Sequence, residues 1–216
     1  MNSNQAAAQR IIGLTGGIAM GKTAVSSYLA SRHHLPILDA DVYAREAVVP
    51  GTSVLAAIVD RYGSGVLLSD GHLNRQRLGE IVFNSPAERQ WLEQCVHPYV
   101  RDRLVAERNT PPLNNAHHCP VLVMVIPLLF EARMTDLVTE TWVVTCSRDC
   151  QIKRLVGRDH LSVEQAIARI ESQMDISKKI SRANAVLDNS TSLDNLFLQV
   201  DEYLAHQPDP LSTQQL

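Results

Sequence analysis

Hydrophobic positions in this chain form short apolar runs that alternate with segments of helical periodicity. The apolar runs predict strands at 10–15, 35–38, 121–126, 141–145 and 185–187. Apolar residues spaced three and four apart predict helices at 22–32, 42–48, 54–62, 75–83, 87–96, 98–108, 149–158, 162–174 and 192–205. Strands that alternate with helices are typical of an α/β fold with a parallel sheet. The run 121–126 is apolar throughout, as expected of a strand buried on both faces.

Proline at position 98 is expected to divide the region 87–108 into two helices. Proline lacks the N–H that continues a helix, but it is well accepted at a first helical position. His97, Pro98 and Arg101 would then gather at a helix start, where they could bind an anionic part of a substrate. A capping histidine beside a surface arginine is the alternative that these residues leave open.

Composition and charge indicate an ordinary globular protein. The chain has 216 residues, of which 45% are hydrophobic and 20% charged, and this excludes a disordered or fibrous protein. The net charge of −3 offers no electrostatic reason to expect a nucleic-acid or membrane partner. The first residues lack a signal-peptide pattern, and the longest apolar run is too short to span a bilayer. We therefore expect a cytoplasmic protein with polar tails at 1–9 and 207–216 and no obligate protein partner.

The cysteines do not form a recognisable metal motif. The chain has four of them and no CxxC pair: Cys95, Cys119, Cys146 and Cys150. Cys146 and Cys150 together with His117 and His118 match no common zinc spacing. We expect free thiols.

Residues 16–23, GGIAMGKT, match the pattern GxxxxGK[ST] between a predicted strand and a predicted helix, and we call them the phosphate loop. Glycines let the backbone N–H groups converge on an anion, and the helix that begins at Lys22 adds its positive dipole end. Lys22 is predicted to reach the β- and γ-phosphates, and Thr23 to ligate Mg²⁺. A nucleoside triphosphate should contact Gly16, Gly17, Ile18, Ala19, Met20, Gly21, Lys22, Thr23 and Ala24.

The remaining pattern favours a kinase over a switch GTPase or a motor. The sequence has no NKxD-like segment and no DxxG after a strand, and the run 121–126 ends in proline instead of Asp-Glu. Asp39 and Asp41 follow the second predicted strand, which we expect beside the phosphate-loop strand, at the edge where α/β sheets bind ligands. There Asp39 could hold Mg²⁺ and Asp41 could accept a hydroxyl proton. A solvated helix cap is the alternative for either aspartate.

Arg154 and Arg158 lie one helical turn apart and are candidates for a lid that closes over the transferring phosphate. Gly157 lowers helix stability by about 1 kcal/mol relative to alanine, so this segment could hinge. Arg169 and Gln173 are expected to repeat the same spacing on the next helix. A solvated basic face is the alternative for these residues.

These segments together resemble the dephospho-CoA kinase family. The resemblance rests on residues 13–23, 38–51, 70–75, 96–101, 126–132, 151–173 and 183–190, which occur in the family's order. It implies transfer of the ATP γ-phosphoryl group to the ribose 3′-hydroxyl of dephospho-CoA with Mg²⁺. The products would be coenzyme A and ADP, in the last step of coenzyme A biosynthesis.

The resemblance also implies an architecture and a set of roles. It implies one P-loop kinase domain at 10–206, similar to nucleoside-monophosphate kinases, with a parallel-sheet core at about 10–50, 119–150 and 183–206. A helical substrate-binding insert would cover about 51–110 and a lid about 151–175. Asp41 would be the catalytic base, with Lys22, Arg154 and Arg158 as the other catalytic residues. The substrate would contact Asp41, Arg75, His97 and Arg101.

The chain departs from the family pattern at three positions. Ala19 and Met20 replace the usual Gly-Ser, and a positive φ at position 19 would strain alanine. Asn184 replaces a frequent aspartate. Two other functions stay open: a small P-loop kinase that acts on a nucleoside monophosphate or another metabolite, and a nucleotide-binding regulator without transfer. Intact Lys22, Thr23 and Asp41 argue against the regulator.

Overall fold

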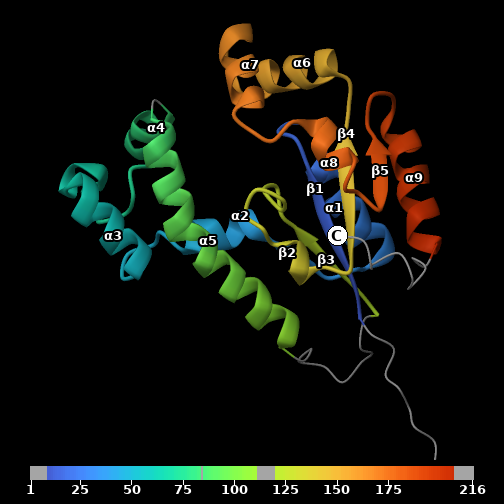
Figure 1. The fold of residues 1–216 in the computed structure, drawn as a ribbon, viewed down its shortest axis with the longest axis horizontal. Helices are drawn as coiled ribbons and strands as arrows, with labels where there is room; N and C mark the ends of the chain where they lie inside the picture. Colours follow the sequence, from blue (N-terminus) through green and yellow to red (C-terminus); the bar gives the residue numbers. More distant parts are fainter. Residues whose placement is uncertain (1–8, 84, 111–119, 207–216) are drawn as a thin grey trace, which may run out of the picture. The chain divides into compact units, whose positions relative to one another are not determined.

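A five-stranded sheet forms the centre of the larger of two compact units (Figure 1). The structure is a computed structural model that describes residues 9–83, 85–110 and 120–206. The strands are β1 (Arg10–Gly16), β2 (Ile37–Asp39), β3 (Val121–Val125), β4 (Glu140–Thr145) and β5 (Ala185–Asp188), in the order β2-β3-β1-β4-β5. The pairs β3–β1, β1–β4 and β4–β5 are parallel, which confirms the predicted α/β class.

The position of β2 corrects one expectation. Because β3 lies between β2 and β1, Asp39 and Asp41 do not follow a strand adjacent to the phosphate-loop strand. β3 occupies that place because its four residues after Val121 are buried, and a central position covers such a strand on both sides. A run of three half-buried residues, as in β2, is tolerated at the edge of a sheet.

Helices follow most strands along the chain. The α-helices are α1 (Lys22–His33), α2 (Ala40–Glu46), α3 (Ser53–Tyr62), α4 (Arg75–Phe83), α5 (Pro86–Asn109), α6 (Arg148–Asp159), α7 (Val163–Glu171), α8 (Ile176–Ile180) and α9 (Leu193–Ala205). Two short 3₁₀ turns, η1 (Ser64–Val66) and η2 (Thr135–Leu137), complete the described elements. No described helix is both long enough and apolar enough to pass through a lipid bilayer.

The core of the larger unit lies between the sheet and the helix pair α1 and α9. Val25 and Leu29 of α1 and Leu196 and Val200 of α9 pack in one cluster with Trp142 and the apolar residues of β1, β3 and β5. The four helical side chains and Trp142 are fully buried. Burial of a large aliphatic side chain stabilises the fold by roughly 1.5–3 kcal/mol, so this cluster holds β1 and the start of α1 in a fixed relation.

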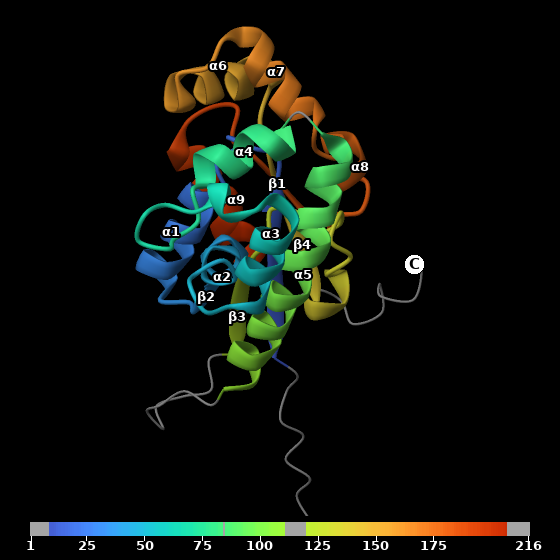
Figure 2. The ribbon, with the colours of Figure 1, turned by 90° about the vertical axis from the view of Figure 1, so that its left-hand side faces the viewer.

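The second unit comprises the described residues of 39–111 and has its own helical core (Figure 2). Val54, Leu55 and Ile58 of α3 are buried in a cluster with Leu78 of α4 and Val66 of η1. Half-buried side chains of α5, including Trp91, pack against the same cluster. The unit is therefore a helical subdomain whose helices are held together by a separate apolar cluster.

Helix α5 runs without interruption through Pro98, so the predicted division into two helices is wrong. A proline inside a helix costs about 3 kcal/mol because it removes one backbone hydrogen bond and crowds the preceding turn. Leu92 and Val96 before the proline and Tyr99 after it all pack against the cluster of the second unit. Since both halves of α5 are packed against one core, the helix continues despite the local cost.

Helix α7 ends at Glu171, three residues earlier than predicted, and the short α8 was not predicted at all. Gln173 therefore lies beyond α7, and its expected helical spacing to Arg169 on that helix is wrong. The chain leaves the helix here because the Met174 N–H donates to the distant Glu131. The Asp175 side chain then caps the next helix, α8. Ser162 caps α7 and forms a capping box with Gln165.

Several expectations fall outside the described residues: the candidate zinc ligands His117 and His118, Cys119, and the tails at 1–8 and 207–216. The cysteines within the described ranges, Cys95, Cys146 and Cys150, are free thiols as predicted. In the same ranges no three His, Cys, Asp or Glu side chains are grouped so that they could hold a metal ion.

Candidate active site

The phosphate loop connects the carboxyl end of β1 to the first residue of α1, as predicted. At two of its positions only glycine fits. Gly16 has a φ of 146°, and a Cβ there would lie 2.3 Å from the Val144 carbonyl oxygen of β4. Gly21 has a φ of 108°, and a Cβ would lie 2.1 Å from the Asn189 side-chain amide. The loop is therefore packed tightly against the ends of β4 and β5.

Helix α1 differs from the other described α-helices at its amino end. Gly21 provides no side-chain cap there, whereas every other described α-helix has a side-chain acceptor for a first-turn N–H: Asp39, Thr52, Asn74, Ser85, Ser147, Ser162, Asp175 and Ser192. Free N–H groups at a helix start bind anions, because the helix dipole and the hydrogen-bond donors act together. The amino end of α1 therefore has the backbone arrangement that can accept an anion such as a phosphate.

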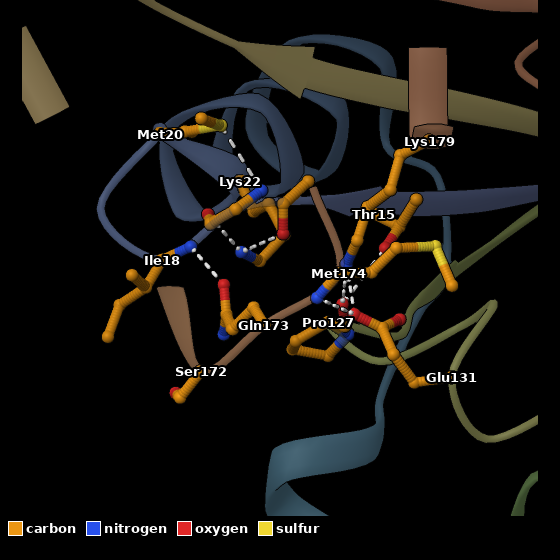
Figure 3. Close-up of polar contacts among 12 residues, drawn as sticks. Thr15, Ile18, Met20, Lys22, Pro127, Glu131, Ser172, Gln173, Met174 and Lys179 are labelled. Atoms are coloured by element: carbon orange, nitrogen blue, oxygen red, sulfur yellow. Dashed lines mark hydrogen bonds and ion pairs between the residues drawn. The ribbon is translucent and has the colours of Figure 1, made fainter. Parts of the chain in front are cut away.

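Ala19 has a φ of 58°, the left-handed value that strains alanine. The neighbouring Met20 faces the protein interior and is only 2% exposed. Its sulfur accepts a hydrogen bond from the Gly17 N–H at 3.2 Å (Figure 3). Within the phosphate loop Ala19 is the one non-glycine residue with a positive φ, and Met20 is packed inside the protein.

Lys22 lies over the phosphate loop. Its Nζ donates to the carbonyl oxygens of Gly16 at 3.0 Å and Gly17 at 2.8 Å, as Figure 3 shows. The ammonium group is therefore held above the same loop whose helix end can accept a phosphate. Thr23, the predicted Mg²⁺ ligand, is solvent-exposed on the first turn of α1.

Asn189, which the sequence analysis did not single out, supports the loop from the end of β5. Its Nδ2 donates to the Met20 carbonyl oxygen at 2.9 Å, and the residue is 3% exposed. Arg154 in turn donates from Nη2 to the Asn189 carbonyl oxygen at 3.0 Å. Its other terminal nitrogen, Nη1, is buried with no hydrogen-bond partner among the described residues. One of the two predicted lid arginines is thus linked to the phosphate loop through one residue.

Arg158 is exposed on α6 and pairs with its neighbour Asp159 at 2.7 Å. Arg169 of α7 reaches the same carboxylate at 2.9 Å. Hydrogen bonds from Arg158, followed by the charges of both arginines, lower the pKa of Asp159, and the same pairing raises the pKa of Arg158. Asp159 therefore joins α6 to α7, and Arg158 sits on the surface of the predicted lid.

Two glutamines contact the phosphate loop, of which the sequence analysis noted only Gln173, for a helical spacing that the structure does not have. Gln151 of α6 donates from Nε2 to the Ile18 carbonyl oxygen, and Gln173 accepts from the Ile18 N–H, both at 2.9 Å. Gln151 is 3% exposed. A buried glutamine at the first turn of an amphipathic helix is the signal that could have identified Gln151, because such an amide needs partners.

The remaining predicted residues belong to the second unit. Asp39 caps α2 and accepts from the Asp41 N–H at 2.9 Å, as its alternative interpretation predicted, and Asp41 itself is exposed. Arg75 is the exposed first residue of α4, and its guanidinium lies 3.4 Å from the Arg45 carbonyl oxygen. His97 and Arg101 are both half-buried on α5.

The prediction that a helix begins near His97 and helps to bind an anion is wrong, because α5 begins at Pro86. The N–H groups near these residues are therefore committed to the helix interior. His97 and Arg101 are instead four positions apart on one helix and so share a face. Their role in substrate binding stays a prediction that depends on their side chains alone.

Asn184, the third departure from the family pattern, has a structural position. Its Oδ1 accepts from the Thr141 N–H at 2.8 Å, and its own N–H donates to the Thr141 carbonyl oxygen at 2.9 Å. Asn184 directly precedes β5, at the amino ends of the strands, whereas the phosphate loop follows the carboxyl end of β1. An aspartate could accept the same hydrogen bond. Because Asn184 lies at the opposite ends of the strands from the phosphate loop, its departure from the family pattern does not alter the loop.

Comparison with known proteins identifies the family. A family model described as dephospho-CoA kinase matches residues 10–195. The dephospho-CoA kinase of Trichormus variabilis is 57% identical over 196 residues, 89% of this chain and 95% of that protein. The Synechocystis dephospho-CoA kinase is 47% identical over 199 residues, 92% of this chain and 96% of that protein.

Solved structures agree with this comparison. The crystal structure of TT1252 from Thermus thermophilus superposes with a TM-score of 0.74 at 32% identity, covering 92% of this chain and 97% of that one. The dephospho-CoA kinase from Campylobacter jejuni superposes with a TM-score of 0.61 at 25% identity, covering 90% of this chain and 94% of that one. The fold is that of a P-loop kinase, and the chain belongs to the dephospho-CoA kinase family.

Proposed function

We propose that this protein phosphorylates the ribose 3′-hydroxyl of dephospho-CoA with ATP, in the last step of coenzyme A biosynthesis. The observation that carries the proposal is the uncapped amino end of α1 beneath the GGIAMGKT loop, with the Lys22 ammonium above it. Such an end binds phosphate groups in general. Membership of the dephospho-CoA kinase family supports the choice of acceptor.

The chain's own residues supply orientation and charge. Backbone N–H groups at the amino end of α1 and the Lys22 ammonium hold the β- and γ-phosphates. The acceptor hydroxyl oxygen attacks the γ-phosphorus, the bond from that phosphorus to the bridging oxygen breaks, and ADP leaves with the bond's electrons. Asp41 accepts the hydroxyl proton, while Arg154 and Arg158 stabilise the charge on the transferring group. On the acceptor side, Arg75, His97 and Arg101 bind the anionic substrate.

The proposed metal is Mg²⁺, which neutralises charge on the β- and γ-phosphates when bound. The donors are of the type that this ion takes, because the Thr23 hydroxyl and the Asp39 carboxylate would each offer an oxygen ligand. Mg²⁺ commonly uses one or two protein ligands together with substrate phosphates and water. One Asp39 oxygen already accepts from the Asp41 N–H, which orients the carboxylate.

The test is a coupled ADP-release assay with Mg·ATP and a panel of acceptors: dephospho-CoA, AMP, CMP, pantetheine phosphate and shikimate. We expect release with dephospho-CoA alone. Release with another acceptor would leave the P-loop kinase in place and contradict the proposed substrate. Silence with every acceptor, while ATP still binds in a calorimetric titration, would contradict the enzyme proposal and favour a nucleotide-binding regulator.

A further inference from the structure

One peptide segment of the phosphate loop is held on both sides by side-chain amides. The Ile18 N–H donates to Gln173 Oε1 and the Ile18 carbonyl accepts from Gln151 Nε2, each at 2.9 Å; Figure 3 shows the Gln173 contact. An N–H can pair only with an amide oxygen, and a carbonyl only with an amide N–H. The two glutamines therefore have opposite roles, one as acceptor and one as donor, and each orientation is dictated by its partner.

These glutamines stand at the two ends of the segment that carries the predicted catalytic arginines. Gln151 is on the first turn of α6, and Gln173 follows the end of α7. Arg154 and Arg158 lie between them on α6. Asp159 joins α6 to α7 through Arg169. Both ends of the segment 151–173 are thus hydrogen-bonded to one residue of the phosphate loop, Ile18.

The end at Gln173 is braced by a second set of contacts. The adjacent Met174 N–H donates to Glu131 Oε1 at 3.2 Å, and the buried Lys179 pairs with the same oxygen at 2.8 Å. Lys179 also donates to the Pro127 carbonyl oxygen at 3.1 Å. That oxygen accepts as well from the Thr15 hydroxyl at 3.1 Å, in the strand that leads into the loop (Figure 3).

The contacts thus form a closed ring, from Ile18 through Gln173, Met174, Glu131, Lys179 and Pro127 back to Thr15 of β1. Since Lys179 is wholly buried and paired, Glu131 cannot move away from it without leaving a buried ammonium group unpaired. Gln173 is therefore held in a fixed place by groups other than its own partner. A residue that is itself held in this way can fix the position of the group it contacts, which here is the Ile18 N–H.

We infer that Gln173 is a positioning residue for phosphoryl transfer. It fixes Ile18, and with it the phosphate loop, relative to the helix that carries Arg154 and Arg158, and Gln151 does the same from the other end. The inference rests on the proposed kinase function. Its role is to position the loop, and contact with the substrate or the reacting atoms is not part of that role. Misplacement of reacting groups by about 1 Å can cost about a hundredfold in rate, which is the scale of effect available to such a residue.

The decisive variant is Gln173→Met, which has a similar size and no acceptor. We expect kcat per mole of folded protein to fall about ten- to a hundredfold, with the KM for ATP within about threefold of the unaltered protein. Gln173→Glu keeps an acceptor oxygen for the Ile18 N–H and should therefore restore most of kcat. We expect its added negative charge to change mainly the KM for ATP. A residue that only stabilised the fold would lower the folded fraction and leave kcat per folded molecule unchanged.

Gln165→Met is the matched control. Gln165 on α7 also accepts from one backbone N–H, that of Ser162 at 3.0 Å, and it does not contact the phosphate loop. We expect its kcat to equal that of the unaltered protein. Amide hydrogen exchange of the ATP-free protein provides a readout besides activity: protection at Ile18 should fall in Gln173→Met and persist in both Gln173→Glu and Gln165→Met.

The outcomes separate the inference from the proposed function. An unaltered protein that phosphorylates dephospho-CoA, together with Gln173→Met at full kcat or with no rescue by glutamate, overturns the inference alone. If the unaltered protein uses a different acceptor, the proposed substrate is wrong, and the same kcat comparison with that acceptor decides the inference. If it transfers phosphate to none, both are wrong.

Discussion

The ammonium group of Lys179 is wholly buried and lies 2.8 Å from a carboxylate oxygen of Glu131, whose side chain is 21% exposed. The two residues come from α8 and from the loop after β3, 48 positions earlier in the chain. Breaking a buried ion pair is costly because it leaves an uncompensated charge, and the cost depends on which partner remains. The unequal exposure of this pair makes that dependence measurable.

We therefore expect the two single substitutions to differ. Glu131→Leu leaves the buried ammonium unpaired and should lower the free energy of unfolding by about 3–5 kcal/mol. Lys179→Met should cost less, because the Glu131 side chain is partly exposed and its Oε1 keeps the hydrogen bond from the Met174 N–H. The double variant leaves no charge and should be less destabilised than the sum of the two. Urea unfolding at neutral pH measures all three, and simple additivity would show that the pair is not coupled.

Replacing the strained alanine of the phosphate loop should stabilise the protein. Ala19 has a φ of 58°, a conformation that costs a non-glycine residue roughly 1–2 kcal/mol. Glycine removes this strain, but the greater freedom of the unfolded chain costs the folded state about 0.4–1 kcal/mol, so Ala19→Gly should gain up to about 1.5 kcal/mol. Ala30→Gly, inside α1, is the control and should instead lose about 1 kcal/mol. Chemical denaturation of both variants tests the opposite signs.

Asp41→Asn tests the proposed general base. The substitution keeps the size of the side chain and removes its ability to accept a proton, so turnover should fall at least about a hundredfold while the affinity for ATP is nearly unchanged. Steady-state kinetics with dephospho-CoA and calorimetric titration with ATP measure the two effects. Asp60→Asn, at an exposed aspartate of α3, serves as control and should leave turnover unchanged. Retained turnover in Asp41→Asn would refute the assignment.

Lys22→Ala tests the phosphate loop itself. Because the Lys22 ammonium is the one side-chain cation that contacts the loop carbonyls of Gly16 and Gly17 in the described part of the chain, its loss should reduce transfer by about a hundred- to a thousandfold or more. The circular dichroism spectrum should not change, since the side chain is not in the core. Lys153→Ala, an exposed lysine of α6, is the control. Normal kinetics in Lys22→Ala would contradict the nucleotide site.

The acid stability of the second unit should depend on Glu88. Hydrogen bonds from Arg61 at 2.7 and 3.0 Å and from Tyr62 at 2.6 Å lower the pKa of Glu88 to about 2, and burial with the Glu88 contact raises the pKa of Tyr62 to about 12. A carboxyl whose folded pKa lies below its ordinary value of 4.5 stabilises the fold above that value. The contribution is lost as the pH falls towards 2.

Glu88→Gln should therefore remove a pH-dependent contribution to stability. The difference in Tm between the unaltered protein and the variant should be largest above pH 5 and should shrink as the pH approaches 2. Thermal unfolding over this range measures it, and Glu80→Gln, at an exposed glutamate of α4, is the control. A Tm difference that does not change with pH would mean that the carboxylate charge is not what stabilises this contact.

Much of the fold follows from local spacing and could be predicted. The apolar runs identified all five strands, and the GxxxxGKT pattern placed the loop between β1 and α1 correctly. It also marked Ala19 as the position where a positive φ would cause strain, and that φ is positive. These features depend on residues within one or two turns of each other, so a pattern along the chain contains the physical information.

Features that depend on distant partners were missed or wrong. Local rules end a helix at Pro98, yet packing of both halves against one apolar cluster keeps α5 continuous. Similarly, the spacing to Arg169 suggested a place for Gln173 on α7, whereas its acceptor role toward Ile18 exists only because the chain returns to the phosphate loop.

By itself, then, the sequence determined the α/β class, the nucleotide loop and the family, because each is encoded by consecutive residues or by the order of short segments. Only the tertiary structure decided the place of β2 beyond β3, the support of the loop by Asn189, and the pairing of Glu131 with Lys179. Buried polar groups need partners wherever the fold brings one within reach, and the distance along the chain carries no information about that choice.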